Sequence, residues 1–181
     1  MKPTALIVGL GNPGKSYAKT RHNLGWLALD VIADTLKAGD WKRSEKFDAE
    51  LAEAAAGIVL MKPHTFMNLS GESVHKAIDF YKLPPERVLA LCDDIDLPLG
   101  EVRYRQNGGP GTHNGLRSLV EHVGEGFARV RLGLGKDTGP MDLAAWVLSV
   151  PSKEEQIVLV QSYQKAAALT QEWLTALKKS E

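Results

Sequence analysis

Apolar and polar residues alternate in short blocks along the 181-residue chain, and most apolar blocks have the length of a strand. A run of four to eight apolar residues is typical of a buried strand, and strict alternation is typical of a half-buried one. Two blocks flank Ala55-Ala56-Gly57, as the strands of a hairpin do. These patterns predict strands at Ala5–Val8, Asp48–Ala54, Ile58–Lys62, Val88–Cys92, Val102–Arg105 and Ala128–Leu134.

Four other stretches repeat their apolar residues at helical spacing. Asn23 stands where it can cap the first helix, and Pro84-Pro85 ends the second. Ser152 and Glu155 form a capping box at the start of the last helix. The predicted helices run from Leu24 to Lys37, from Asn68 or Ser70 to Lys82, from Gly115 to Val123, and from Ser152 through Leu177.

The mixture of strands and helices predicts an α/β fold with a mixed, partly parallel sheet and a long C-terminal helix. A chain of 181 residues is long enough for one domain with a sizeable core and too short for two comfortable ones. We therefore expect one compact domain over residues 1–181.

Composition is that of an ordinary soluble protein, with 44% hydrophobic and 24% charged residues. The longest apolar runs are too short to cross a bilayer. The run Ala5–Leu10 is cut off by Gly-Asn-Pro-Gly, which indicates a strand and a turn and not a signal peptide. Cys92 is the single cysteine, so no internal disulfide can form. These features favour a cytoplasmic protein without membrane contact.

Net charge is zero, which argues against a protein that coats nucleic acid. Basic side chains nevertheless outnumber acidic ones in residues 1–46 and 99–140, while acidic ones dominate residues 47–98. If the two basic segments meet in the fold, they make a local basic surface. The alternative is that the charge simply varies along the chain.

One glycine-rich motif and one acidic motif match the spacing or composition of known ligand sites, but the surrounding sequence disfavours both interpretations. Gly9-x-Gly11-x-x-Gly14 has dinucleotide-loop spacing, but Pro13 and the residues after it delay the helix that would hold a pyrophosphate. The Asp93-Asp94-Ile95-Asp96 cluster follows a buried strand and could hold a divalent cation. One working carboxylate among solvated neighbours is the favoured interpretation there.

Nucleophiles are scarce. The chain has no Gly-x-Ser-x-Gly elbow, and Cys92 lies inside an apolar strand. A hydrolase built this way would use water, which needs a base. His22 and His113 each precede an asparagine in a polar loop, and either could serve. His64 lacks a clear partner, and His75 and His122 fall within helices.

Four segments, in order and in register, resemble the bacterial-type peptidyl-tRNA hydrolases over nearly the whole chain. They are Val8-Gly-Leu-Gly-Asn-Pro-Gly14 with Tyr17 and Thr20-Arg-His-Asn23, Lys62-Pro-His-Thr-Phe-Met-Asn-Leu-Ser-Gly71, Asp93-Asp-Ile-Asp-Leu-Pro98, and Gly108-Gly-Pro-Gly-Thr-His-Asn-Gly-Leu116. The resemblance implies hydrolysis of the ester between a peptide and the 3′ end of tRNA. It also implies a twisted mixed sheet, a monomer, and no metal or other cofactor.

The resemblance assigns roles to single residues. His22 matches the catalytic histidine, Asp93 the carboxylate that keeps it a competent base, and Asn12 the residue that distinguishes blocked from unblocked aminoacyl-tRNA. Arg105 and Arg131 match contacts to tRNA phosphate. The remaining substrate-binding positions are Tyr17, Phe66, Met67, Asn68, His113 and Asn114, with His113 supporting rather than catalysing.

One residue departs from the family pattern, and two other functions stay open. Thr112 stands where the family commonly has glycine, which puts the flexibility of this loop in question. A non-catalytic RNA-binding module on the same fold is possible, since fold does not fix function. The other alternative is a metal-dependent phosphoesterase that uses Asp93, Asp94 and Asp96.

Overall fold

Seven strands form one sheet in the order β2-β3-β4-β1-β5-β7-β6 in the computed structural model, which describes residues 2–136 and 138–179. β1 pairs in parallel with β4 and β5, and β5 pairs in parallel with β7. β2, β3 and β6 join antiparallel. The strands are β1 (Ala5–Gly9), β2 (Lys42–Ser44), β3 (Ala49–Ala54), β4 (Ile58–Pro63), β5 (Val88–Asp94), β6 (Val102–Arg105) and β7 (Ala128–Gly133).

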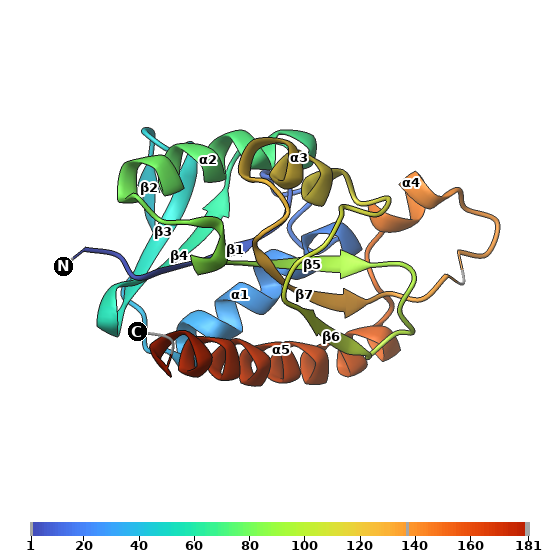
Figure 1. Cartoon of the computed structure of the whole chain (residues 1–181). Coiled ribbons are helices and arrows are strands. Elements are labelled where there is room, and N and C mark those ends of the chain that lie inside the picture. The colour runs from blue at the N-terminus through green and yellow to red at the C-terminus, as the bar shows by residue number, and fades with distance from the viewer. Residues whose placement is uncertain (1, 137, 180–181) are drawn as a thin grey trace.

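Helices cover both faces of the sheet (Figure 1). α1 (Leu24–Thr35) and α5 (Lys153–Lys179) lie on one face, and α2 (Ser70–Tyr81) and α3 (Asn114–Val123) lie on the other. The short helix α4 (Leu143–Val147) stands apart from both layers. Single 3-10 turns occur at η1 (Arg21–Asn23), η2 (Ala55–Gly57), η3 (Met67–Leu69) and η4 (Pro85–Arg87).

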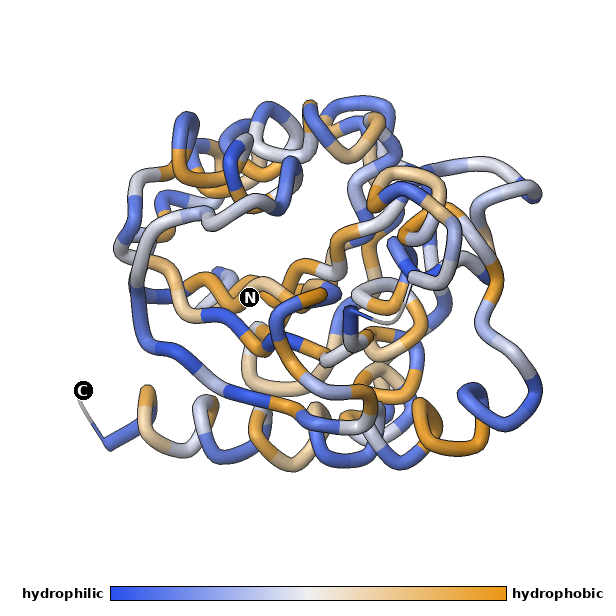
Figure 2. The backbone as a smooth tube through the Cα atoms, turned by 90° about the vertical axis from the view of Figure 1, so that its right-hand side faces the viewer, coloured by the Kyte–Doolittle hydropathy of each residue, from blue (hydrophilic) through white to orange (hydrophobic). Residues whose placement is uncertain are grey.

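Strand periodicity divides the core into two layers. Ile7 and Leu89 face α1 and α5, whereas their neighbours Leu6 and Ala90 face α2 and α3. Successive side chains of a strand point to opposite faces, so central parallel strands need apolar residues at every position. Figure 2 shows hydrophobic segments on the inner strands, while the outer helices alternate between hydrophobic and hydrophilic.

The predicted α/β class is confirmed, together with the mixed sheet and the long final helix. The capping box is also confirmed: the Ser152 backbone N–H donates to Glu155 Oε2 (2.6 Å), and the Glu155 N–H donates to Ser152 Oγ (3.2 Å). The prediction that the Asn23 side chain caps α1 is wrong. That side chain makes no cap hydrogen bond and binds the backbone of Asn12 instead.

β2 and α4 were missed by the sequence analysis because both are short. Three residues give no alternation to detect, and five give little more than one helical turn. In the described part of the chain, no helix is both long enough and apolar enough to cross a membrane.

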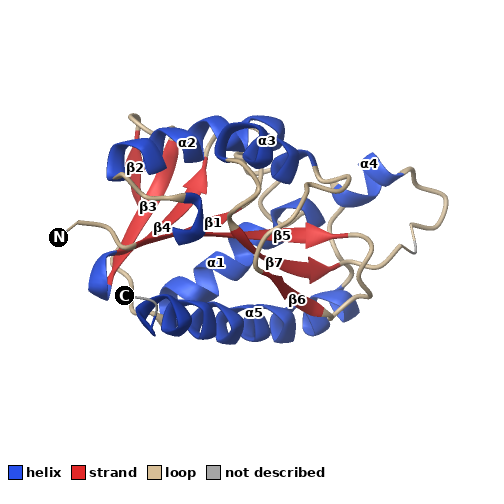
Figure 3. Cartoon of the chain, viewed as in Figure 1, coloured by secondary structure: helices blue, strands red, loops and turns tan. Residues whose placement is uncertain are grey.

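Loops follow the carboxyl ends of the parallel strands at one edge of the sheet (Figure 3), and several of the residues predicted to be functional lie in or next to them. The segment from Leu10 to η1 follows β1, and Asp93 and Asp94 end β5. Parallel strands bring their carboxyl ends to one edge of a sheet. This topology brings the catalytic candidates of three distant segments together.

Candidate active site

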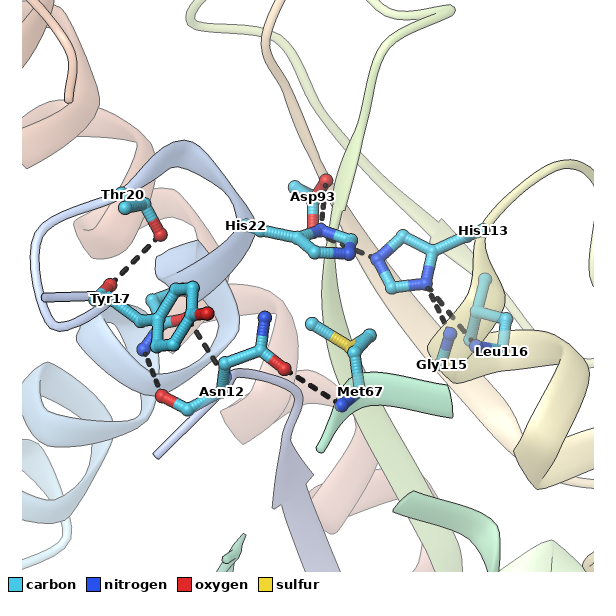
Figure 4. A network of polar contacts seen from close by, with 10 residues as sticks. Asn12, Tyr17, Thr20, His22, Met67, Asp93, His113, Gly115 and Leu116 are labelled. Atoms are coloured by element: carbon cyan, nitrogen blue, oxygen red, sulfur yellow. Dashed lines mark hydrogen bonds and ion pairs between the residues drawn. The ribbon is translucent and has the colours of Figure 1, made fainter. Parts of the chain in front are cut away.

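The Asp93 carboxylate joins the two loop histidines (Figure 4). Asp93 is 3% exposed near the end of β5. Its Oδ1 and Oδ2 lie 3.0 and 3.1 Å from His22 Nδ1, and Oδ1 lies 2.8 Å from His113 Nε2. An ionised carboxylate only accepts hydrogen bonds, so His22 Nδ1 and His113 Nε2 each carry a proton. A neutral His22 therefore keeps its lone pair on Nε2.

A second interaction of the His113 ring fixes its tautomer. Its Nδ1 accepts from the backbone N–H of Gly115 (3.1 Å) and of Leu116 (3.3 Å), so the ring caps α3. A protonated Nδ1 could not accept these bonds. With one nitrogen donating to Asp93 and the other accepting from α3, His113 has no free lone pair for a substrate proton. Of the two histidines, His22 is the candidate base.

Electrostatics keep Asp93 ionised and make His22 a stronger base. Burial lowers the pKa of His22, but the charge of Asp93 and its hydrogen bond together raise it above the ordinary value. Burial raises the pKa of Asp93, but His113 and His22 outweigh this and hold it well below the ordinary value. Burial also raises the pKa of the Cys92 thiol, which excludes it as a thiolate nucleophile.

Asn12 is buried and held from three directions. Its backbone N–H donates to Asn23 Oδ1 (2.9 Å), and Asn23 Nδ2 donates back to the Asn12 carbonyl (3.0 Å). Its side-chain Oδ1 accepts from the Met67 N–H (2.7 Å), which joins the loop after β1 to η3. With Oδ1 occupied, the amide nitrogen points to the side where His22 lies (Figure 4). Asn12 therefore presents a donor there.

The other predicted substrate-binding residues differ in exposure. Tyr17 is half-buried. Phe66 is 56% exposed, and Asn68 is exposed on η3. Asn114 is exposed at the first turn of α3, where its Oδ1 accepts from Arg117 Nη1 (3.2 Å).

A cavity of about 470 Å³ opens beside the histidines. Asn12, Tyr17 and residues 66–68 do not line it, so the predicted substrate-binding residues form two groups on either side of Asp93. The lining consists of His22, residues 93–96, Arg105, residues 107–114, Leu116, Arg129, Arg131, Leu143, Ala144 and Val147.

Three arginines line the cavity, and one of them forms an ion pair that the sequence did not predict. Arg131 Nη1 lies 2.8 Å from Asp94 Oδ2, and both side chains are largely covered. The expectation that Asp94 is a solvated neighbour of Asp93 is therefore wrong, because consecutive residues of β5 point to opposite faces and Asp94 meets β7. Arg105 is exposed. Arg129 was missed: it is buried and donates from Nη1 to the Gly109 carbonyl (2.7 Å).

Alternation along β7 could have identified Arg129, since it shares a strand face with Arg131. Arg21 was also missed. Its position beside His22 was visible, but its partners at Trp146, Ser149 and Glu155 lie far along the chain. Of the two basic segments, residues 99–140 supply all three arginines of the cavity, while residues 1–46 supply only His22 to its lining.

Metal binding competes with hydrogen bonds at this site. Among the described residues, His22, Asp93 and His113 place one ligand atom each within 4.8 Å of one another, but these atoms already share protons. The acidic cluster itself is dispersed, since Asp93 binds two histidines, Asp94 pairs with Arg131, and Asp96 pairs with Lys136. This weighs against a shared cation held by the three carboxylates.

Comparisons with known proteins show the family and the fold. A family model described as peptidyl-tRNA hydrolase matches residues 6–181. The peptidyl-tRNA hydrolase of Desulfitobacterium hafniense (strain Y51) is 43% identical over 172 residues, which cover 93% of this chain and 91% of that protein. The one from Oceanobacillus iheyensis is 40% identical over 174 residues, with the same two coverages of 93% and 91%. A crystal structure of peptidyl-tRNA hydrolase from Acinetobacter baumannii has a TM-score of 0.89 at 34% identity, covering 99% of this chain and 93% of that one.

Proposed function

This chain belongs to the peptidyl-tRNA hydrolase family, and on that premise we propose that His22 is the general base of its reaction and Asp93 the carboxylate that orients it. The reaction is hydrolysis of the ester between a peptide and the 3′ end of tRNA, which releases both. Its cellular use is the recycling of tRNA from prematurely released peptidyl-tRNA. The observation that carries the residue roles is the Nδ1–H of His22 donating to a buried carboxylate, which leaves Nε2 as an acceptor.

The chemistry follows from that tautomer. Nε2 of neutral His22 takes a proton from water, and the hydroxide attacks the ester carbonyl to form a tetrahedral oxyanion. Asp93 favours the imidazolium that forms. The oxyanion collapses, the bond to the ribose oxygen breaks, and His22 returns its proton to that oxygen. The products are a tRNA hydroxyl and a peptide carboxylic acid, which loses its proton to solvent as a carboxylate.

Asn12 supplies the selectivity for a blocked amino group. Its amide nitrogen can donate to a peptide carbonyl beside the ester but cannot accept from a cationic amine, and its Oδ1 is directed at the Met67 N–H, from which it already accepts. An uncompensated buried polar group costs about 1–3 kcal/mol. Unblocked aminoacyl-tRNA is therefore disfavoured.

Asn12→Asp tests this role without disturbing the fold, because an aspartate oxygen can still accept from Met67. The second oxygen replaces the donor with a negative charge facing the amine. We expect kcat/KM on blocked substrate to fall and the relative rate on unblocked aminoacyl-tRNA to rise. An unchanged ratio of the two kcat/KM values would show that Asn12 does not discriminate.

The remaining contacts divide between the two groups of residues. We assign Tyr17, Phe66, Met67, Asn68, His113 and Asn114 to the peptide and the tRNA 3′ end. Arg105, which is exposed, and Arg131, which is paired with Asp94, are assigned to tRNA phosphate. Arginine grips phosphate without reading base sequence. Residues 1–181 are proposed to act as one monomeric, cytoplasmic domain without a cofactor.

The deciding experiment is incubation with an N-blocked aminoacyl-tRNA, watching for free tRNA. We expect the wild-type protein to release tRNA, also in the presence of EDTA, and His22→Ala to lose about 10²- to 10⁴-fold in turnover. His75→Ala is the matched control, since that histidine is exposed on α2 away from the cavity lining. Near-wild-type turnover in a folded His22→Ala protein would remove His22 from the mechanism.

A further inference from the structure

Arg21, the residue directly before His22, is only 4% exposed and holds a distant segment of the chain. Its Nη1 donates to Ser149 Oγ (2.6 Å), and its Nη2 donates to Glu155 Oε2 (2.6 Å). The guanidinium carbon lies 3.6 Å from the centre of the Trp146 ring. One side chain thus uses both ends of its planar fork and its flat face at once.

Backbone atoms reinforce the same connection. The Arg21 N–H donates to the Ser149 carbonyl (3.0 Å), and Ser149 Oγ donates to the Trp146 carbonyl (2.6 Å). Glu155 Oε2 also accepts from the Ser152 N–H at the start of α5. Arg21 therefore joins the turn that carries His22 to the end of α4 and to the capping box of α5.

A different side of α4 faces the cavity. Leu143, Ala144 and Val147 line it together with His22, while Trp146, on the same helix, packs on Arg21. A helix of five residues is too short to be stable by itself, because it forms too few backbone bonds to offset nucleation. The position of α4 is therefore set by its tertiary contacts.

We propose that Arg21 is a positioning residue that holds α4 as a wall of the cavity at a fixed place relative to His22. This inference rests on the proposed function, in which the cavity receives part of the substrate. Binding groups of the substrate against α4 then aligns the ester with the base. Arginine is required for this because a lysine ammonium is a point charge that cannot fork to Ser149 and Glu155 while stacking on an indole.

The first experiment is a double-mutant cycle between Arg21→Lys and Leu143→Ala, because Arg21 binds residues 146, 149 and 155 whereas Leu143 lines the cavity. In the wild-type background we expect Leu143→Ala to raise KM for blocked aminoacyl-tRNA by several fold. In the Arg21→Lys background KM is already raised by on the order of tenfold, and Leu143→Ala adds little. Leu148→Ala is the matched control, since that exposed leucine follows α4 and does not line the cavity.

The pH profile separates positioning from chemistry. Arg21 does not contact Asp93, and the groups that face His22 are Asp93 and His113, with Asp94, Asp96, Arg105, Arg129 and Arg131 also lining the cavity. Arg21→Lys should therefore leave the midpoint of the acid limb of kcat in place while KM rises. Additive effects of Arg21→Lys and Leu143→Ala, or a moved midpoint, would overturn the proposal.

Amide hydrogen exchange gives a readout that needs no activity. In Arg21→Lys we expect exchange in residues 143–149 to accelerate by about tenfold or more, while α2 stays protected. Trp146→Leu, which keeps the Arg21–Glu155 pair, should give a smaller acceleration in the same segment and serves if Arg21→Lys does not fold. Unchanged exchange at 143–149 would overturn the proposal even if the enzyme is active. Failure of His22→Ala to lose activity would instead refute only the proposed mechanism.

Discussion

The loop after β1 and the loop before α3 both border Asp93, yet they are built in opposite ways. In the first, a Cβ added at Gly11 would lie 2.7 Å from the Trp26 ring, and one added at Gly25, in the first turn of α1 against this loop, would lie 2.4 Å from the Leu91 carbonyl. In the second, no atom lies within 4 Å of the place where a Cβ would stand at Gly108 or Gly111.

The burial of the two loops differs as well. Hydrogen bonds to Asn23 fix the backbone of Asn12, and a hydrogen bond from the Met67 N–H fixes its side chain. The 107–112 segment is largely exposed, and its backbone positive φ falls on Gly108 (139°) and Gly111 (57°). Thr112, the departure from the family pattern, therefore avoids a left-handed conformation, because Gly111 takes it instead.

The difference fits two tasks. Proton transfer needs a base and a donor placed to within a few tenths of an ångström, which demands packing on every side. A peptide of any sequence needs a surface that can adapt, which favours exposed glycines. The predictions below test whether rigidity on one side and openness on the other explain the behaviour of the variants.

Asp93→Asn should give the largest effect, a loss of about 10²- to 10⁴-fold in kcat near neutral pH. We expect the wild-type acid limb at a higher pH than an ordinary histidine would give, because the base must be neutral and Asp93 raises the pKa of His22. Without the carboxylate charge, burial dominates and the limb should move to lower pH. Asp94→Asn, whose partner is Arg131, should leave the limb in place; a shift there instead would mean that the wrong carboxylate was assigned.

Gly25→Ala, in α1 against the loop after β1, and Gly109→Ala, in the loop before α3, compare how tightly the two loops are packed. The new methyl group at Gly25 meets the carbonyls of Leu91 and Leu10 at 2.4 and 2.5 Å, so we expect a loss of about 3 kcal/mol in the free energy of unfolding. At Gly109 the nearest atom is Glu125 Oε1 at 3.8 Å, and we expect a change within about 0.5 kcal/mol. Denaturant unfolding measures both. Equal losses would contradict the contrast between the loops.

His113→Asn and His113→Gln separate the two interactions of the His113 ring, its hydrogen bond to Asp93 and its cap of α3, and should give the smallest effects. Asparagine can still cap α3 but is too short to reach Asp93. The His113→Asn protein should therefore keep its stability. Its acid limb should shift to higher pH, because a carboxylate that has lost one hydrogen-bond donor binds the His22 proton more tightly. Glutamine can reach Asp93 but not cap; its variant should keep the limb and lose about 1 kcal/mol of stability. Identical profiles for both variants would show that His113 does not tune His22.

Periodicity was sufficient for most of the fold. The strands β1 and β5 and the helix α2 were predictable because a long apolar run or a helical repeat leaves few other ways to bury the same side chains. The three-residue β2 and the five-residue α4 carry no such signal. The Asn23 cap failed because its amide makes two bonds to the backbone of Asn12, eleven residues away, in place of a local one.

For the candidate site, the sequence by itself determined the kinds of group: a histidine in a polar loop, a carboxylate at a strand end, and asparagines in glycine-rich turns. Only the tertiary structure decided which carboxylate binds which basic side chain. Asp93 and Asp94 are adjacent and chemically identical, but the pleat of β5 sends one to two histidines and the other to Arg131. Likewise, the role of Arg21 depends on residues 128 and 134 positions away, a separation that no local pattern encodes.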